Sequence, residues 1–203
     1  MQKIMFIDPL EKSVMRGDKT MTRRIITVPR RKVDGKDAYG FEVWKKQGIP
    51  FDVWITGEND ETLCQLEPRF KVGEIVALAQ RYRDIRDIIG DVHDGKSIKF
   101  MQGWWNKMFV KADLMPHQIK ITDIGIERLQ DISDGDCLRE GIFARHDVID
   151  TQMRDVIRYQ YPDTPHLFKT PKEAFAHLID KVSRKGTWAS NPFVFVYSFK
   201  LIK

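Results

Sequence analysis

The chain has 203 residues, of which 42% are hydrophobic and 31% are charged. This composition describes a soluble globular protein rather than a disordered or membrane-spanning one, and no apolar run approaches the roughly 18 residues that a transmembrane helix needs. The first residues lack a signal-peptide pattern, so we expect a cytoplasmic protein. The net charge of +5 fits a polyanionic partner without requiring one.

The two cysteines, Cys64 and Cys137, lie far apart in the sequence. Neither has a second cysteine or histidine at ligand spacing, so the sequence predicts neither a disulfide nor a zinc site. We expect two thiols in a reducing compartment, and no metal or cofactor.

The N-terminal elements are expected to be a strand, a helix and a second strand. Residues 3–7 form a short apolar run typical of a buried strand. Asp8 then suits a helix N-cap, and Glu11 completes a capping box. Gly17 is placed to end this helix, and the β-branched residues of 22–28 predict the next strand.

The next part of the chain is expected to hold an excursion and two strands. Residues 29–50 are rich in glycine, proline and charge, with a hairpin near 41–44. An alternating strand is expected at 51–56. A glycine turn at Gly73 then leads into a buried strand over 74–79.

Residues 84–107 are polar and contain glycine, which predicts a loop or an insertion. This segment includes the pair Trp104 and Trp105, which either cap the edge of a core or stack on a base. We favour the core, because adjacent exposed tryptophans are rare.

The C-terminal part predicts strands and helices in alternation. Strands are expected at 117–129 and 193–202, with a short helix capped by Ser133 and closed by Gly141 between them. Val148, Val156 and Ile157 indicate a helix over 147–159. A last helix is expected to open with a capping box at Thr170 and Glu173 and to end at Gly186, with an inner face made of Phe175, Leu178, Ile179 and Val182.

Many short strands with helices in their connections predict an α+β domain on a small, strongly bent sheet or barrel. The chain contains no phosphate-binding P-loop, dinucleotide-binding, serine-hydrolase or zinc-peptidase motif. Nucleotide hydrolysis and the other reactions of those motifs are therefore not expected.

Three segments together carry a family resemblance: GDKTMTRR at 17–24, KVGEIV at 71–76 and ERLQDISDGDCLREGI at 127–142. They resemble the ASCH domain, a member of the PUA-like superfamily of small β-barrels. The GxKTxTxR core matches at Gly17, Lys19, Thr20, Thr22 and Arg24. The likeness continues in the segment around Trp188, Asn191 and Pro192.

The resemblance implies a single domain with a cleft beside the barrel that accepts RNA or a modified nucleoside. Some small bacterial members of the family are amidohydrolases that remove the acetyl group of N4-acetylcytidine with a lysine, a threonine and a glutamate. By motif position these are Lys19, Thr22 and Glu140. Relative to those shorter members, the chain has insertions near 29–70, 84–115 and 145–170.

Amide hydrolysis needs a nucleophile, a base, an acid for the leaving amine and stabilisation of the oxyanion. Thr22 is the expected nucleophile, and Lys19 is the base once burial and nearby arginines lower its pKa. Glu140 ends a short helix, where the helix dipole disfavours negative charge, which suits an acid. Arg24 and backbone amides are candidates for holding the oxyanion.

Further residues are expected to bind RNA or the nucleoside: Gly17, Thr20, Arg23, Arg24, Glu74 and Tyr82. The strand that ends in this region has Gln80 and Tyr82 where we expect longer, phage-associated relatives to have an acid and a tryptophan.

Two other functions stay open. In a non-catalytic RNA-binding module, cations contact phosphates and Tyr82 or Trp105 stacks on a base; these cations are Arg23, Arg24, Arg30, Arg31 and Lys32. In a ribonuclease, Lys19 and Arg24 flank a phosphodiester. For each residue alone, an exposed and solvated side chain is the simpler explanation.

Overall fold

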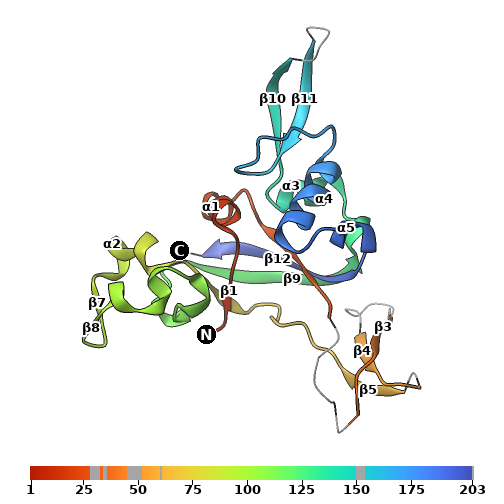
Figure 1. Ribbon diagram of the computed structural model, residues 1–203, viewed down its shortest axis with the longest axis horizontal. Coiled ribbons are helices and arrows are strands. Elements are labelled where there is room, and N and C mark those ends of the chain that lie inside the picture. The colour runs from red at the N-terminus through yellow and green to blue at the C-terminus, as the bar shows by residue number, and fades with distance from the viewer. Residues whose placement is uncertain (28–32, 34–35, 45–51, 60, 150–153, 203) are drawn as a thin grey trace.

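The computed structural model describes residues 1–27, 33, 36–44, 52–59, 61–149 and 154–202 (Figure 1). It is an α+β structure, as the sequence predicts. A five-stranded sheet has the strand order β1-β6-β9-β12-β2. These strands are β1 (Lys3–Ile4), β6 (Ile75–Leu78), β9 (Gln118–Arg128), β12 (Phe193–Ile202) and β2 (Met21–Ile25).

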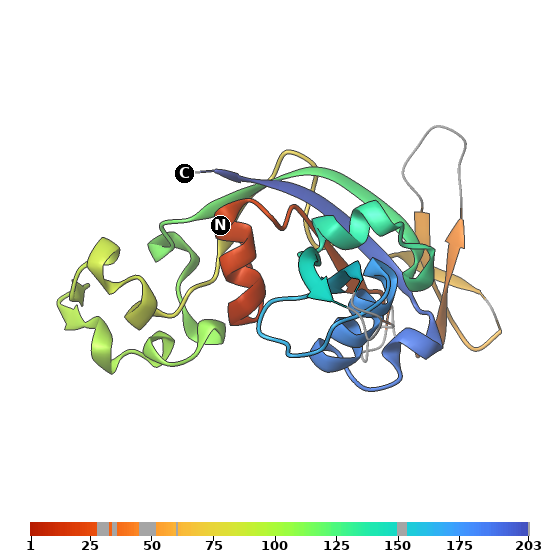
Figure 2. The ribbon, with the colours of Figure 1, turned by 90° about the horizontal axis from the view of Figure 1, so that it is seen from above.

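The long strands β9 and β12 are neighbours within this sheet, and they curve side by side across the molecule (Figure 2). Both are antiparallel to their neighbours, whereas β1 runs parallel to β6. Ser198 and Phe199 of β12 pair with Asp123 and Ile121, so Thr122 of β9 is left out of the register, and such a bulge bends the strand that carries it. The alternating apolar residues of these strands supply much of the main core, for example Ile119, Ile121 and Val194.

No closed barrel is found among the described residues, so the expected small barrel is not observed. Strands β1 and β2 are the two edges of the sheet and do not pair with each other. Strand β1 has only two residues before the chain leaves it for a helix. The gap is bridged by a side chain instead, because Arg24 Nη2 donates to the carbonyl oxygen of Met5 at 2.7 Å.

The helices are α1 (Asp8–Arg16), α2 (Arg86–Ile89), α3 (Asp134–Arg139), α4 (Pro171–Val182) and α5 (Thr187–Ser190). The predicted caps are confirmed for α3, where Ser133 accepts from the backbone of Asp136, and for α4, where Thr170 accepts from Glu173. Helix α4 ends four residues earlier than expected, and Gly186 precedes α5 instead.

The predicted capping box of α1 is wrong. The N-cap residue is Ile7, which has no side-chain acceptor, and Asp8 is already helical. The two acids point to other partners, because Asp8 pairs with Arg81 at 2.7 Å and Glu11 pairs with Lys107. The predicted end at Gly17 is confirmed by its φ of +83°.

The predicted helix over 147–159 is also wrong. The described residues of this segment lie in two antiparallel strands, β10 (Phe143–Ile149) and β11 (Asp155–Gln160), which project away from the main sheet (Figure 1). Val148 and Val156 are paired across the two strands. Their spacing therefore reflects a cross-strand pair of β-branched residues rather than one face of a helix.

A separate antiparallel sheet contains β3 (Gly40–Trp44), β4 (Asp52–Thr56) and β5 (Thr62–Gln65). The strand predicted at 51–56 corresponds to β4, whereas the hairpin predicted near 41–44 is instead one strand, β3, that pairs with β4. A short hairpin of β7 (Val92–His93) and β8 (Lys96–Ser97) lies at the other end of the molecule (Figure 1).

The insertion over 82–115 has a small core of its own. It contains α2, the β7–β8 hairpin and short 3-10 helices at Tyr82–Asp84, Ile98–Phe100, Gln102–Trp104, Lys107–Phe109 and Ala112–Leu114. A further 3-10 helix, Leu129–Asp131, follows β9. Trp104 is half-buried against the small core, as expected, but Trp105 is 68% exposed beneath the guanidinium of Arg83.

We predict that Gly103→Ala destabilises this insertion. A Cβ at Gly103 lies 2.4 Å from a ring carbon of the fully buried Tyr82, and such overpacking costs about 1–3 kcal/mol of unfolding free energy. Urea unfolding measures the effect. Gly125→Ala is the control, because its Cβ has no neighbour nearer than 3.9 Å. Equal stability of the two variants contradicts the prediction.

No helix in the described parts of the chain combines the length and the hydropathy needed to cross a membrane.

Candidate functional site

A cleft of about 420 Å³ lies between the segment that enters α1, strand β2 and helix α4. The three residues predicted to be catalytic, Lys19, Thr22 and Glu140, all line it. The sequence motifs therefore predicted correctly that Glu140 shares a cleft with Lys19 and Thr22, although it lies more than 115 positions from both in the chain. The rest of the lining is largely apolar and includes Phe6, Leu10, Leu129, Phe175, Leu178 and Val194.

Backbone hydrogen bonds fix the segment that carries Lys19. The chain leaves α1 through the left-handed Gly17, and the amide of Lys19 then donates to the carbonyl of Ser13 at 3.1 Å. The amide of Thr20 donates to the carbonyl of Arg139 at 2.9 Å, which joins this segment to the end of α3. Lys19 and Glu140 are thus positioned by adjoining backbone.

The side chain of Lys19 is almost completely buried, with only 2% of the residue exposed. Its Nζ donates to the carbonyl of Met21 at 2.7 Å, to the carbonyl of Glu140 at 2.8 Å and to Oε2 of Glu140 at 2.5 Å. Burial lowers the pKa of Lys19, and although Glu140 opposes this, Arg24 and Arg23 add to it. The sequence predicted this direction for the same reason.

Glu140 is the C-cap residue that follows α3, and its carboxyl group lies between two cations. Its Oε2 faces Lys19, and its Oε1 lies 3.1 Å from Nη1 of Arg23. A helix end contributes about 0.3–1 kcal/mol at an exposed site, whereas these cations contact a carboxylate whose side chain is 5% exposed. The cations therefore dominate its surroundings, and the helix-end argument for an acid does not hold.

The hydrogen bonds around Lys19 and Glu140 are satisfied with the proton on either partner. An ammonium uses its three N–H groups on the three oxygens. A neutral amine uses two N–H groups on the carbonyls of Met21 and Glu140, and its lone pair accepts from a protonated Glu140 carboxyl. The ion pair and the neutral pair therefore fit the same geometry, and burial is the main cause that lowers the pKa of Lys19 toward the neutral amine.

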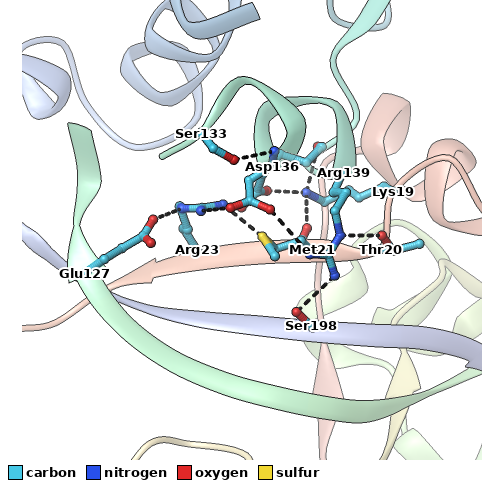
Figure 3. Close-up of polar contacts among 10 residues, drawn as sticks. Lys19, Thr20, Met21, Arg23, Glu127, Ser133, Asp136, Arg139 and Ser198 are labelled. Atoms are coloured by element: carbon cyan, nitrogen blue, oxygen red, sulfur yellow. Dashed lines mark hydrogen bonds and ion pairs between the residues drawn. The ribbon is translucent and has the colours of Figure 1, made fainter. Parts of the chain in front are cut away.

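Arg23 is a structural cation rather than a free substrate contact. Its guanidinium is bound by Glu127 at 2.7 Å, by Glu140 at 3.1 Å and by Asp136 at 3.5 Å (Figure 3). Its side chain is 1% exposed. Arg23 lines the cleft, but its charge is already offset by three carboxylates.

Thr22 and Arg24 lie two positions apart on β2, so they share a face of that strand. Thr22 is buried and lines the cleft, and no hydrogen bond of its hydroxyl is found among the described residues. Arg24 is exposed, and its guanidinium lies 5.5 Å from the centre of the Phe6 ring. Both groups are available to a ligand.

Four other predicted binding residues lie outside the cleft lining. Gly17 ends α1, and Thr20 accepts from Arg139 at 3.5 Å. Glu74 binds the backbone of Lys71 within its own turn. Tyr82 is fully buried in the insertion, where its hydroxyl accepts from a backbone amide. Stacking of Tyr82 on a base does not fit this arrangement.

The proposed phosphate contacts Arg30, Arg31 and Lys32 lie outside the described residues. Within the described ranges, no group of three histidine, cysteine or acidic residues is arranged to hold a metal ion. Cys137 is buried, which raises the pKa of its thiol to about 12 and leaves it unreactive at neutral pH.

Two parts of the cleft were not anticipated. Phe175, Leu178 and Ile179 were expected to face inward, but not to form a wall of the site. Lys107 comes from the insertion and also reaches the lining, where Asp8 at 2.7 Å and Glu11 hold its ammonium. The mixed apolar and cationic character of 95–112 was the available signal.

Comparison of the chain with protein-family models, curated proteins and solved structures finds no match. Any assignment of the chain to a family therefore rests on its sequence motifs and on the geometry of the cleft.

Proposed function

We propose that the chain is an ASCH domain of the PUA-like superfamily that binds RNA or a modified nucleoside in this cleft and hydrolyses the amide of an N4-acylated cytosine. The observation that carries the proposal is the buried pair of Lys19 and Glu140 in the same cleft as the hydroxyl of Thr22. A buried pair that shares one proton offers a base and an acid at once.

In the first half of the reaction, the carboxyl proton of Glu140 turns from Lys19 to N4 of the cytosine, which frees the lone pair of Lys19. Oγ1 of Thr22 attacks the acyl carbon, and its proton passes to this neutral amine. The protonated Glu140 gives its proton to N4 of the cytosine as the C–N bond breaks. An acyl ester of Thr22 and the deacylated cytidine result. Lys19 is then an ammonium and Glu140 a carboxylate, and a proton transfer over their 2.5 Å contact restores the starting pair.

Water attacks the ester in the second half. Lys19 takes a proton from the water, and Glu140 returns a proton to Oγ1 of Thr22 as the carboxylic acid leaves. Arg24 supports the oxyanion in both halves, because it lines the cleft, is exposed and has N–H groups beyond the one bound to Met5.

The size and lining of the cleft suit a nucleoside. Its volume of about 420 Å³ lies within the roughly 300–1,000 Å³ usual for small-molecule sites. Phe6 and Phe175 offer apolar surface to a base. Arg24 and Thr22 offer a few polar groups beside it, which is the usual composition of such a site.

The test is incubation of the purified protein with N4-acetylcytidine at neutral pH, with cytidine followed by chromatography. We expect turnover by the wild type and its loss in Glu140→Gln, which keeps the shape of the side chain but carries no acidic proton. Turnover that survives in Glu140→Gln contradicts the role of the pair, and no turnover by a folded wild type contradicts the proposed reaction.

We predict a bell-shaped dependence of kcat/KM on pH. The reactive pair holds one proton, so activity is lost when the pair gains a second proton at low pH or loses its only proton at high pH. The high-pH limb follows the lysine, whose pKa burial lowers, and therefore lies below about 10.4. Activity that still rises above that pH contradicts the shared-proton mechanism.

The two alternative functions predict different experimental results. RNA binding without catalysis weakens steeply as salt rises and tolerates Glu140→Gln. Cleavage of a phosphodiester by Lys19 and Arg24 shortens labelled RNA. We favour amide hydrolysis, because the three N–H groups of a charged Lys19 are already bound to Met21 and Glu140 and leave none for a phosphate.

A further inference from the structure

A second cavity, of about 480 Å³, adjoins the cleft. The two share Met5, Arg24 and Ile25 in their linings. The hydrogen bond from Arg24 to the carbonyl of Met5 lies at this shared boundary. A ligand that contacts Thr22 in the cleft therefore needs only to pass Arg24 to reach the second cavity.

Three cations line the second cavity: Lys3, Arg24 and Arg69. Among the residues that the structure describes, the side chains of all three donate hydrogen bonds to backbone carbonyls only. Nζ of Lys3 donates to the carbonyls of Met108 and Val110 at 2.7 and 2.6 Å, and Nη2 of Arg69 donates to the carbonyl of Lys3 at 3.3 Å. Carbonyl dipoles satisfy hydrogen bonds, but they do not cancel a full charge.

No carboxylate among the described residues lies within ion-pair distance of these three cations. Glu67 also lines the cavity, but its side chain is 70% exposed and lies 3.8 Å from Lys71. The contrast with Arg23 is large, since three carboxylates bind that guanidinium. Within the described parts of the chain, the cations of the second cavity therefore have no carboxylate in direct contact.

Arg69 lies close enough to repel both Lys3 and Arg24. Burial lowers the pKa of Lys3, and the charge of Arg69 lowers it further. Desolvation of the guanidinium by surrounding atoms is the main cause that lowers the pKa of Arg24, even though the residue as a whole is exposed; Arg69 adds to this shift and Glu140 opposes it. An anion among the three relieves this repulsion.

Aromatic rings form the rest of the wall. Phe70, Phe195 and Tyr197 line the same cavity, and the guanidinium of Arg69 lies 5.3 Å from the centre of the Phe70 ring. Cations beside aromatic surface are the usual means of holding the phosphates and bases of single-stranded nucleic acid.

We infer that the second cavity binds a phosphate group of a nucleotide whose base occupies the cleft. The preferred substrate is then a phosphate ester of the modified nucleoside, either a mononucleotide or one residue of an RNA strand, and the free nucleoside is a more weakly bound substrate of the same site. The identity of the base rests on the proposed function, whereas the phosphate site rests on Lys3, Arg24 and Arg69 alone.

The experiment is calorimetric titration at pH 7 with cytidine, cytidine 5′-monophosphate and a short single-stranded oligocytidine RNA. None of these probes carries an acyl group, so failure of the hydrolysis assay does not affect the result. We expect the monophosphate to bind at least about tenfold more tightly than cytidine, the usual effect of a charge-assisted hydrogen bond.

Arg69→Ala is the test variant, because Arg69 is exposed and forms no ion pair with a carboxylate among the described residues. We expect it to weaken binding of the monophosphate about tenfold and that of cytidine less than about twofold. Lys120→Ala is the matched control, since Lys120 is an exposed cation on β9 that lines neither cavity.

Tighter binding of the RNA than of the monophosphate supports a strand as the source of the phosphate, and equal binding supports a mononucleotide. With RNA, Arg69→Ala is expected to reduce the slope of log affinity against log salt by about 0.7. Equal binding of cytidine and its monophosphate overturns the inference, as do equal losses in Arg69→Ala and Lys120→Ala.

Discussion

Replacement of Lys19 by methionine is expected to reduce kcat/KM for N4-acetylcytidine by about 10²–10⁴-fold, the usual contribution of a general base. The change keeps an unbranched side chain in the buried site but removes both the amine and its contact with Glu140. Oγ1 of Thr22 then has no group to receive its proton. The measurement is the initial rate of cytidine formation by protein that is shown to be folded.

Loss of stability has to be separated from loss of chemistry in this variant. Glu140 keeps its contact with Arg23 at 3.1 Å, so the carboxylate is not left without a cation. Gly103→Ala is the control, because it destabilises the insertion at a position outside the cleft lining. If Lys19→Met retains the activity of that control, Lys19 is not the base.

The second large effect is expected on stability, from Arg23→Met. This change leaves three carboxylates, Glu127, Asp136 and Glu140, without their common cation. Breaking a buried ion pair by removing one partner costs about 3–5 kcal/mol of unfolding free energy. Urea unfolding at pH 7 measures the loss.

Arg139→Met is the matched control for this prediction. Arg139 is also close to Asp136, at 3.4 Å, but its side chain is 46% exposed. An exposed pair contributes about 0–1 kcal/mol. Equal losses in Arg23→Met and Arg139→Met contradict the view that Arg23 is the structural centre of the network.

The structure shows which sequence signals are local enough to interpret. The caps at Ser133 and Thr170 and the left-handed Gly17 depend on a few neighbouring residues, and they were predicted. The segment 147–159 was not, because two β-branched residues eight positions apart, Val148 and Val156, satisfy both a helix face and a hairpin register. Only the cross-strand pairing decides between the two.

The candidate site was likewise predicted only in part from the sequence. Lys19, Thr22 and Glu140 were placed in one cleft by motif position, and the lowered pKa of Lys19 followed from its expected burial. The partners of Arg23 were not foreseen, since Glu127 and Asp136 reach it from separate elements. Long-range ion pairs leave no periodic pattern in a sequence, and neither does the burial of Tyr82 in a second core.

The central claim is that Thr22 attacks an N4-acyl group with Lys19 and Glu140 as its proton partners. In the most direct measurement, the wild type is mixed with an equal amount of N4-acetylcytidine and the reaction is quenched within the first turnover. Free cytidine is then determined, together with the mass of the protein before and after digestion to peptides. We predict cytidine release together with one acetyl group on the peptide that contains Thr22. Cytidine release from a protein that is never acetylated, or no release at all, contradicts the account.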